Sequence, residues 1–425
     1  MARPGRGVGI ATLAVGLTLL GVVRTATAAR QDASTVPDTT PDSVAIGYRH
    51  HAAIRPDYVG DLVPPRLQPI HIPPPPASRP PDHVRGIYMN AWVFGGARLA
   101  GLVALADTTE INTFVIDVKE VNGFLSYRSS VPTAIEIGAN ARVAVRNPRE
   151  RLAMLKAHGI HTVARIVVAK DSLLATQKHG WAIRDTSGGI WLDRFGVPWV
   201  DAYRDSVWIY AAELAQEAVL LGFGEVQFDY VRLPDEKPER MAAAVFRARR
   251  PGESRRSGIR RNLELLRDRL KPMGVPFALD VFGLTTSARG DMGIGQVWED
   301  LVRVADVVLP MVYPSHYYAG AYGFRWPNAE PYGVVRRALS DGLARTAGIP
   351  NAATIRPFLQ SFSIRRVVYR APEIRAQIDA VYDLGLTDWI LWNASSRYPA
   401  DAFLPAAPGA VAESPAMRGT IPPER

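Results

Sequence analysis

Short apolar segments recur along the chain between Arg85 and Ser395, each followed by a polar or Gly-rich loop and then by a stretch with helical spacing. Eight of these segments are rich in β-branched and aromatic residues, which is typical of buried strands. The predicted strands are Arg85–Trp92, Thr113–Lys119, His161–Ala169, Glu225–Arg232, Pro276–Gly283, Asp306–Pro314, Ile355–Phe362 and Asp388–Ser395.

Amphipathic helices are predicted between the strands, most clearly over Asp205–Leu221 and Arg260–Leu270, where apolar residues recur every three or four positions. Gly222, Gly274 and Gly385 each follow a helical stretch, as glycines at helix C-termini do. Eight strands that alternate with helices predict an α/β protein, a single-domain (β/α)8 TIM barrel. The alternative, a doubly wound open sheet, is disfavoured because no G-x-G-x-x-G motif follows the first strand.

The two ends of the chain differ in composition from this central region. Residues 1–28 carry two early arginines, an apolar run of 16 residues from Val8 to Val23 and small residues around Ala28, the pattern of a secretory signal peptide. We expect residues 29–82 to form a disordered Pro-rich linker, 83–400 the barrel and 401–425 a disordered tail. The protein is therefore predicted to be exported, to the periplasm or the extracellular space. It keeps no stable membrane span after cleavage, and an uncleaved signal would act as a membrane anchor.

Charge and cysteine content narrow the function classes. The 425 residues contain no cysteine, which excludes disulfides, thiolate zinc sites, iron–sulfur clusters and a cysteine nucleophile. The net charge of +9 falls to +6 when residues 1–28 are removed. The densest basic cluster, Arg247–Arg261, holds few aromatics and is interpreted as a solvated loop and helix start, so no nucleic-acid partner is predicted. The remaining charge is weak evidence for a polyanionic partner such as an acidic glycan.

Reactive side chains collect at the C-terminal ends of the predicted strands, where TIM barrels carry their active sites. Because alternate strand residues share a face, Asp117, Asp229 and Asp280 are all predicted to point into the barrel mouth. One such aspartate alone is as often a helix N-cap or the partner of an arginine, but unpaired buried carboxylates are costly, so three together favour function. Lys119 and Arg232 fit two roles, as ion-pair partners of these acids or as ligands for acidic or hydroxyl groups of a substrate.

Aromatic residues accompany these acids. The insert between the third and fourth strands carries Trp181, Trp191, Trp199 and Tyr203, for which core packing is the alternative to substrate binding. Flat apolar rings match the C–H faces of sugars, whereas carboxylates and amides bind the hydroxyl groups. The predicted substrate-binding residues are Lys119, Tyr230, Arg232, Tyr313, His316, Tyr317, Trp199, Trp392 and Asn393.

Paired acids with aromatic platforms indicate the chemistry of glycosidic bonds, in which one carboxyl protonates the leaving oxygen and the other attacks or activates water. Asp229 is predicted to be the nucleophile or base and Asp280 the general acid, with Asp117 as a third catalytic carboxylate. We predict no metal and no cofactor, because the eight histidines show no H-x-H or H-E-x-x-H spacing. Ser-His-Asp chemistry is disfavoured because no G-x-S-x-G motif is present.

The segments Val115–Tyr127, Trp199–Pro234, Leu279–Gly283 and Pro310–Tyr317 resemble a bacterial family of TIM barrels described as glycosyl hydrolase domains, in matching order from about Arg85 to Tyr398. The resemblance implies a barrel and a glycosidase reaction class, without a substrate. The chain is also broadly similar to the α-amylase-like barrels, whose nucleophile is an aspartate at the end of strand four, the place of Asp229. Those enzymes have a glutamate acid at strand five, where this chain has Asp280.

These observations predict an exported glycoside hydrolase that cleaves O-glycosidic bonds of a cell-envelope or extracellular polysaccharide. The predicted partner is this substrate, in polysaccharide or oligosaccharide form. The first alternative is a barrel that binds glycans or acts as an envelope scaffold without catalysis. The second is another barrel hydrolase or lyase, including a metal-assisted one.

Overall fold

The computed structural model describes residues 80–364 and 366–406. The predicted signal peptide, the predicted linker up to residue 79 and residues 407–425 of the predicted tail lie outside the described residues. No helix in the described part of the chain has the length and apolar character needed to cross a membrane.

A closed parallel barrel forms the centre of the described chain. Its strands are β1 (Arg85–Met89), β2 (Thr113–Lys119), β3 (His161–Val167), β4 (Glu225–Asp229), β5 (Phe277–Phe282), β6 (Val307–Met311), β7 (Thr354–Ile355), β8 (Phe358–Gln360) and β9 (Trp389–Trp392). The strand order is β5-β4-β3-β2-β1-β9-β8-β6-β7, and the pairing of β5 with β6 closes the ring.

Two of the segments, β7 and β8, take one place in the barrel. Both pair with β6, where Val307 aligns with Thr354 and Met311 with Phe358. Between them lies Pro357, which has no backbone N–H for the ladder. The barrel therefore has eight strand positions, and the predicted (β/α)8 TIM barrel is confirmed.

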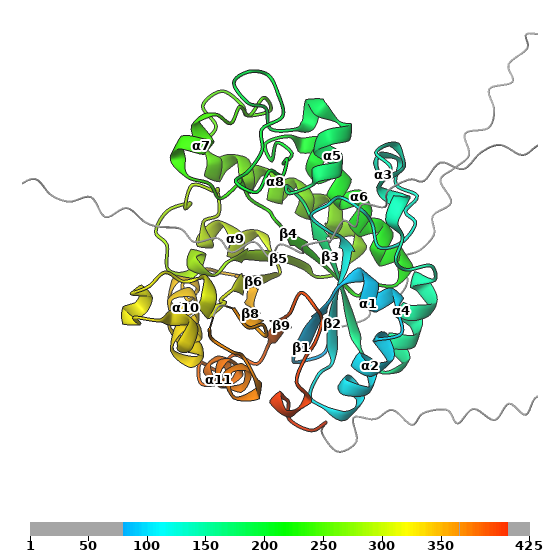
Figure 1. Cartoon of the computed structure of the whole chain (residues 1–425), viewed down its shortest axis with the longest axis vertical. Helices are drawn as coiled ribbons and strands as arrows, with labels where there is room; N and C mark the ends of the chain where they lie inside the picture. The colour runs from blue at the N-terminus through cyan, green and yellow to red at the C-terminus, as the bar shows by residue number, and fades with distance from the viewer. Residues whose placement is uncertain (1–79, 365, 407–425) are drawn as a thin grey trace, which may run out of the picture. The chain divides into compact units, whose positions relative to one another are not determined.

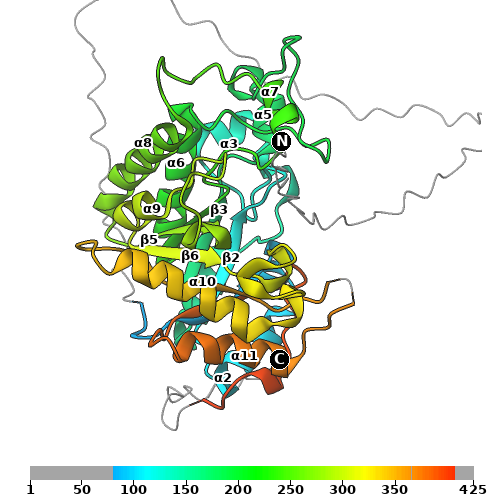
Figure 2. The ribbon, with the colours of Figure 1, turned by 90° about the vertical axis from the view of Figure 1, so that its left-hand side faces the viewer.

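Helices surround the barrel (Figures 1 and 2). They are α1 (Ala91–Gly95), α2 (Leu99–Thr108), α3 (Pro132–Glu136), α4 (Pro148–Ala157), α5 (Ser172–Gln177), α6 (Asp205–Leu221), α7 (Pro238–Ala242), α8 (Arg255–Leu270), α9 (Trp298–Val304), α10 (Pro331–Thr346) and α11 (Ala371–Tyr382). Helix α6 packs on β3 and β4 and on its neighbour α8, whereas α10 and α11 pack together beside β8. The helix predicted over Asp205–Leu221 is confirmed, and Gly222 ends it with a positive φ of 123°.

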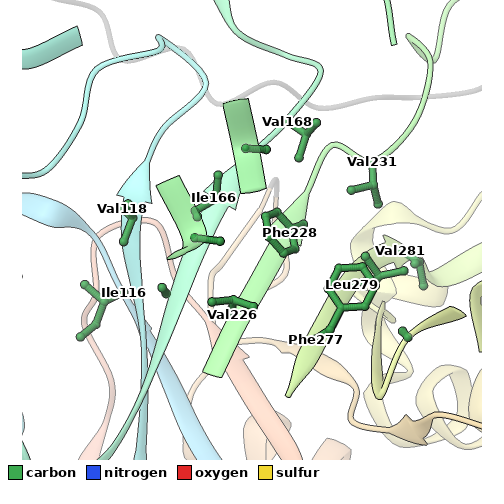
Figure 3. Close-up of a cluster of buried hydrophobic side chains, with 14 of the residues drawn as sticks. Ile116, Val118, Ile166, Val168, Val226, Phe228, Val231, Phe277, Leu279 and Val281 are labelled. Atoms are coloured by element: carbon green, nitrogen blue, oxygen red, sulfur yellow. The ribbon is translucent and has the colours of Figure 1, made fainter. Parts of the chain in front are cut away.

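The outward faces of the strands form the larger apolar core, because they are covered by the helices. Figure 3 shows this layer on β2 to β5, including Ile116, Ile166, Phe228 and Leu279, all of which are fully buried. A second cluster fills the barrel interior. It consists of Val84, Tyr88, Val115, Val163, Ala278, Val307, Leu309, Tyr313, Phe358 and Ile390.

A buried ion-pair cluster lies at the N-terminal end of the strands. Glu225, the first residue of β4, binds Nη1 of Arg356 at 2.6 Å and Nε2 of His161 at 3.3 Å. Nε of Arg356 lies 3.6 Å from Asp388. Active sites of TIM barrels lie at the opposite end, so this cluster has a structural role.

The C-terminal boundary of the domain differs from the expected one. Residues 401–406 are not part of a disordered tail: Phe403 stacks on Trp389 with ring centroids 6.3 Å apart, and the Leu404 N–H donates to Glu110 at 3.0 Å. The Ala- and Pro-rich composition of this segment predicted disorder, although Phe403 anchors the segment to the barrel. The barrel domain therefore extends to at least Ala406.

Candidate active site

Three carboxylates occupy the C-terminal end of the barrel. Asp117 is in β2, Asp229 is the last residue of β4 and Asp280 is in β5. Their exposed fractions are 2%, 6% and 1%, so all three are buried. The alternation of faces along each strand brings them together, as the sequence pattern indicated. Their catalytic roles remain predictions.

Arg165 of β3 joins the three acids, and sequence reasoning missed it. Its Nη1 donates to Asp117 at 2.5 Å, its Nη2 donates to Asp229, and its Nε lies 3.5 Å from Asp280. Asp117 and Arg165 are direct neighbours in the ladder between β2 and β3. The signal was present in the sequence, because Arg165 shares a strand face with His161 and Val163, which point into the barrel.

The two acids of the predicted catalytic pair have different surroundings. Burial raises the pKa of Asp280 well above its ordinary value, and the negative charge of Asp229 raises it further, against the lowering effect of Arg165. The amide of Gln227 donates to both carboxyl oxygens of Asp280, at 2.8 and 3.1 Å. Asp280 is therefore suited to carry a proton, whereas Asp229 holds the ion pair with the guanidinium.

Asp117 lies on the other side of the same guanidinium and also binds a tyrosine. The hydroxyl of Tyr88, in β1, donates to the second oxygen of Asp117. Burial raises the pKa of Asp117 although Arg165 and these hydrogen bonds lower it, and burial together with the charge of Asp117 raises the pKa of Tyr88. Asp117 is thus held by two donors, which suits a residue that orients Arg165.

The backbone after Asp229 is strained. Tyr230 adopts a φ of +54°, in the left-handed region that costs a bulky residue about 1–3 kcal/mol. In this conformation the Tyr230 N–H donates to Asp229 Oδ1 at 2.5 Å. Both oxygens of Asp229 therefore have a donor, and strain of this kind is concentrated at functional sites.

Aromatic side chains line one half of the mouth. Trp392, at the end of β9, lies 5.8 Å from Tyr88, 5.9 Å from Tyr313 and 5.3 Å from Phe362, measured between ring centroids. His316 packs edge-on against Tyr313 at 5.3 Å. Trp392, Tyr313 and His316 are among the predicted substrate-binding residues, and the structure places them in one cluster next to the acids, since Tyr88 contacts both Trp392 and Asp117. Phe362 joins them without having been predicted.

Basic and aromatic side chains line the other half. The guanidinium of Arg232 lies over the rings of Phe282, Tyr230 and Trp199, at 4.3, 4.9 and 5.3 Å from their centroids. Lys170 also lies over Trp199 and Tyr230, at 5.5 and 5.6 Å from their centroids. The structure therefore brings three predicted residues together. Tyr230 and Arg232 follow Asp229 in the sequence, and Trp199 packs against both.

Lys119, predicted to bind substrate or to pair with the three acids, does not point into the barrel and pairs with a different acid. The β2–β3 register shifts between Asp117 and Lys119, which reverses the alternation of faces at the end of the strand. Its amino group binds Asp171 at 2.5 Å and lies 5.2 Å from the centroid of Tyr210 in α6. Lys119 is 1% exposed and belongs to the contact between the barrel and its helices.

Two further predicted residues have structural contacts. Asn393 donates to the Ser361 carbonyl at 2.5 Å and accepts from the Ser395 N–H at 2.9 Å, which fixes the loop after β9. Tyr317 is 7% exposed and packs on Tyr322, with ring centroids 5.4 Å apart, within the outer core. Neither residue is grouped with the carboxylates.

The tryptophans of the insert are mainly part of the core. Trp191 and Trp199 are each 3% exposed, and their indole N–H groups donate to Arg240 O and Asp193 Oδ2. Tyr203 is also buried. Trp191 and Tyr203 are therefore core residues, which was the alternative to substrate binding. Trp199 also makes an edge-to-face contact with Tyr230.

Within residues 80–364 and 366–406, no group of three or more His, Asp and Glu residues is arranged to hold a metal ion. The positive charge between the three carboxylates is supplied by Arg165. The basic segment 247–261 is mostly engaged in ion pairs, for example Arg256 with Asp300 at 2.5 Å and Arg261 with Glu253 at 2.8 Å.

One solved structure supports the fold, and the chain is similar to two others. The glycoside hydrolase domain of PgaB (BpsB) from Bordetella bronchiseptica matches with a TM-score of 0.52 and 14% identity, over 74% of this chain and 95% of that one. A hypothetical protein from Ruminiclostridium thermocellum is 34% identical over 46% of this chain and 97% of its own, with a TM-score of 0.42. The glycoside hydrolase domain of PelA from Pseudomonas aeruginosa is 13% identical over 77% and 98% of the two chains, with a TM-score of 0.41.

No curated protein matches the chain. The sequence pattern of the family described as "Putative glycosyl hydrolase domain" matches residues 86–398, which is most of the chain and nearly all of the barrel. The resemblance noted from the sequence segments is thereby confirmed, and the chain belongs to this family of glycosyl hydrolase domains.

Proposed function

We propose that this protein is an exported glycoside hydrolase that cleaves O-glycosidic bonds of a cell-envelope or extracellular polysaccharide. Asp229 acts as the nucleophile or base, and Asp280 acts as the general acid. One observation carries the proposal: both acids contact the same edge of Arg165, and burial together with the charge of Asp229 raises the pKa of Asp280. Acid–base cleavage of a glycoside requires one carboxyl group that keeps its proton beside a second one.

The steps follow from the contacts. Asp280, protonated, donates its proton to the departing glycosidic oxygen, while Asp229 attacks the anomeric carbon or removes a proton from the attacking water. Arg165 and the Tyr230 N–H orient the Asp229 carboxylate. The rings of Trp392 and Tyr313 offer an apolar face for a sugar beside the acids.

The test is release of reducing sugar from a panel of envelope and plant polysaccharides. We expect activity from the wild type and a loss of about 10³-fold or more in Asp229→Asn. Asp268→Asn, the same substitution on the exposed face of α8, is the matched control and should retain full activity. Equal release by the wild type and Asp229→Asn contradicts the assignment of Asp229.

A second function, glycan binding without catalysis, is favoured by one feature: all three carboxylates already bind Arg165. Under that function the wild type and Asp229→Asn bind a polysaccharide equally and neither releases sugar. Isothermal titration of the same panel with both proteins distinguishes the two functions.

Export is tested separately from the chemistry. We expect the mature protein in the periplasmic or culture fraction of its host to begin near Ala29, and mass spectrometry of its N-terminal peptide measures this. A mature chain that keeps Met1 and sediments with the membrane contradicts cleavage and supports the anchor.

A further inference from the structure

Arg232 is a buried arginine beside the candidate catalytic pair with most of its hydrogen-bonding capacity unused. The residue is 8% exposed, and its Nη1 donates to the Leu233 carbonyl at 3.0 Å. In the described part of the chain, no acidic side chain forms an ion pair with it. A guanidinium has five N–H donors, and burying such a charge without a partner is costly.

The acidic groups around Arg232 are bound to other cations. Asp229 binds Arg165, and Asp235 lies 3.6 Å from Nη2 of Arg194. Asp193 binds Lys170 at 3.4 Å. Arg232 is therefore the member of this group that lacks a carboxylate.

Aromatic rings hold Arg232 in place. Phe282 follows Asp280 by two positions in β5 and lies on the same strand face, and its ring is 4.3 Å from the guanidinium carbon. Tyr230 and Trp199 contact the guanidinium as well. Cation–π contacts compensate part of the cost of burial and leave the N–H edges of the guanidinium available.

The unused donors lie on one edge. Because Nη1 is engaged by Leu233, the Nε and Nη2 atoms remain, and together they form the planar fork that binds a carboxylate through two parallel hydrogen bonds. The same edge is used elsewhere in this protein, where Nε and Nη2 of Arg256 donate to the two oxygens of Asp300 at 2.5 and 2.8 Å.

We propose that the Nε–Nη2 edge of Arg232 binds the carboxylate of a uronic acid residue, so that the substrate is an acidic polysaccharide. This inference rests on the proposed function and names the substrate class of the same site. The uronate lies next to the bond being cleaved, since Arg232 stacks on Phe282 above Asp280 and follows Asp229 by three residues. Lys170, paired with Asp193, also lies over the rings of Trp199 and Tyr230.

The test uses polyuronates, namely polygalacturonate, polyglucuronate and polymannuronate, each paired with its carboxyl-reduced neutral form. Binding is measured by isothermal titration in the Asp229→Asn background, so that hydrolysis does not interfere. We expect at least one polyuronate to bind about tenfold or more tightly than its reduced form. Arg232→Gln should abolish this difference. Arg85→Gln removes an arginine that also lies over a ring, at the other end of the barrel, and should leave the difference intact.

Arg232→Lys provides a second measurement if Arg232→Gln fails to fold. Lysine keeps the charge but not the two-pronged geometry, so the discrimination should fall and not vanish. Equal binding of the acidic and neutral polymers overturns the inference, as does discrimination that survives Arg232→Gln. Preference for a phosphate-bearing wall polymer over every polyuronate overturns the assignment to a carboxylate.

The two proposals fail in different ways. Uronate discrimination without any sugar release contradicts hydrolysis alone. Sugar release from neutral and acidic polymers at equal KM contradicts the uronate site alone.

Discussion

Arg165 and Asp117 are neighbours on adjacent barrel strands, and their side chains meet at 2.5 Å between Nη1 and Oδ1 inside the barrel mouth. This contact fixes the guanidinium so that its other edge faces Asp229 and Asp280. Burial acts to lower the pKa of Arg165, but the charges of Asp117 and Asp229 overcome that effect and raise it well above its ordinary value. The guanidinium therefore stays charged and allows three carboxyl groups to share one buried site.

We expect Arg165→Met to lower the free energy of unfolding by about 3–5 kcal/mol, because it leaves Asp117 and Asp229 buried without their cation. The loss should be larger at pH 8 than at pH 5. Without Arg165 the folded pKa of Asp117, which burial already raises, rises further, and a carboxyl group with a raised folded pKa reduces stability as the pH rises from its unfolded to its folded pKa. Urea unfolding at both pH values measures this.

The control is Arg267→Met, which removes an exposed arginine of α8 and should change stability by less than about 0.5 kcal/mol. A loss in Arg165→Met that is the same at both pH values would contradict the electrostatic explanation.

Asp280→Asn should reduce cleavage of natural glycosides far more than cleavage of activated aryl glycosides. A nitrophenolate leaves without protonation, whereas an alkoxide needs the proton of a general acid. The ratio of kcat/KM for the two substrate types, compared between the wild type and the variant, measures the acid role. Equal losses on both types would assign Asp280 to a role other than the general acid.

Lys119→Met should destabilise the fold by about 3–5 kcal/mol and leave KM unchanged. The substitution removes the cation that pairs with Asp171. Asp171 is fully buried and also caps α5 by accepting from the Leu174 N–H at 2.8 Å. Thermal unfolding and steady-state kinetics of the same preparation measure the two effects. An increase in KM with unchanged stability would return Lys119 to the substrate site, against its contacts in the structure.

Protonation of Glu225 should lower the unfolding free energy of the wild type in acid. Burial acts to raise the pKa of Glu225, but Arg356 and the hydrogen bond from His161 overcome it and leave that pKa below its ordinary value. A carboxyl group with a lowered folded pKa contributes stability in full above its unfolded pKa and loses that contribution as the pH falls through the folded pKa.

Glu225→Gln should remove this acid-dependent contribution. Urea unfolding of wild type and variant between pH 3 and pH 6 should give a difference in unfolding free energy that shrinks as the pH falls. The difference isolates Glu225, because Asp117 and Asp280, whose folded pKa values are raised, titrate in both proteins. A difference that is constant over this range would contradict the role of the ion pair with Arg356.

The alternation of short apolar segments with helical stretches was sufficient to predict the barrel. Buried parallel strands need apolar side chains on both faces, and covering helices need an apolar stripe. The start of β2, β3 and β4 was predicted at the observed residue. The end of β2 was also predicted at the observed residue, whereas the ends of β3 and β4 were predicted too late; in β4, Tyr230 turns into the left-handed region. Residues beyond such a turn keep a strand-like composition, so their sequence does not reveal the end.

The same alternation placed Asp117, Asp229 and Asp280 at one end of the barrel interior, since parity along a strand and the direction of the strand are local properties. It did not place Lys119, because one extra residue in the β2–β3 ladder reverses the parity. It also did not reveal Arg165 as the common partner of the acids. Which charges meet across a barrel depends on the stagger of four strands far apart in the sequence, and only the tertiary structure decided that.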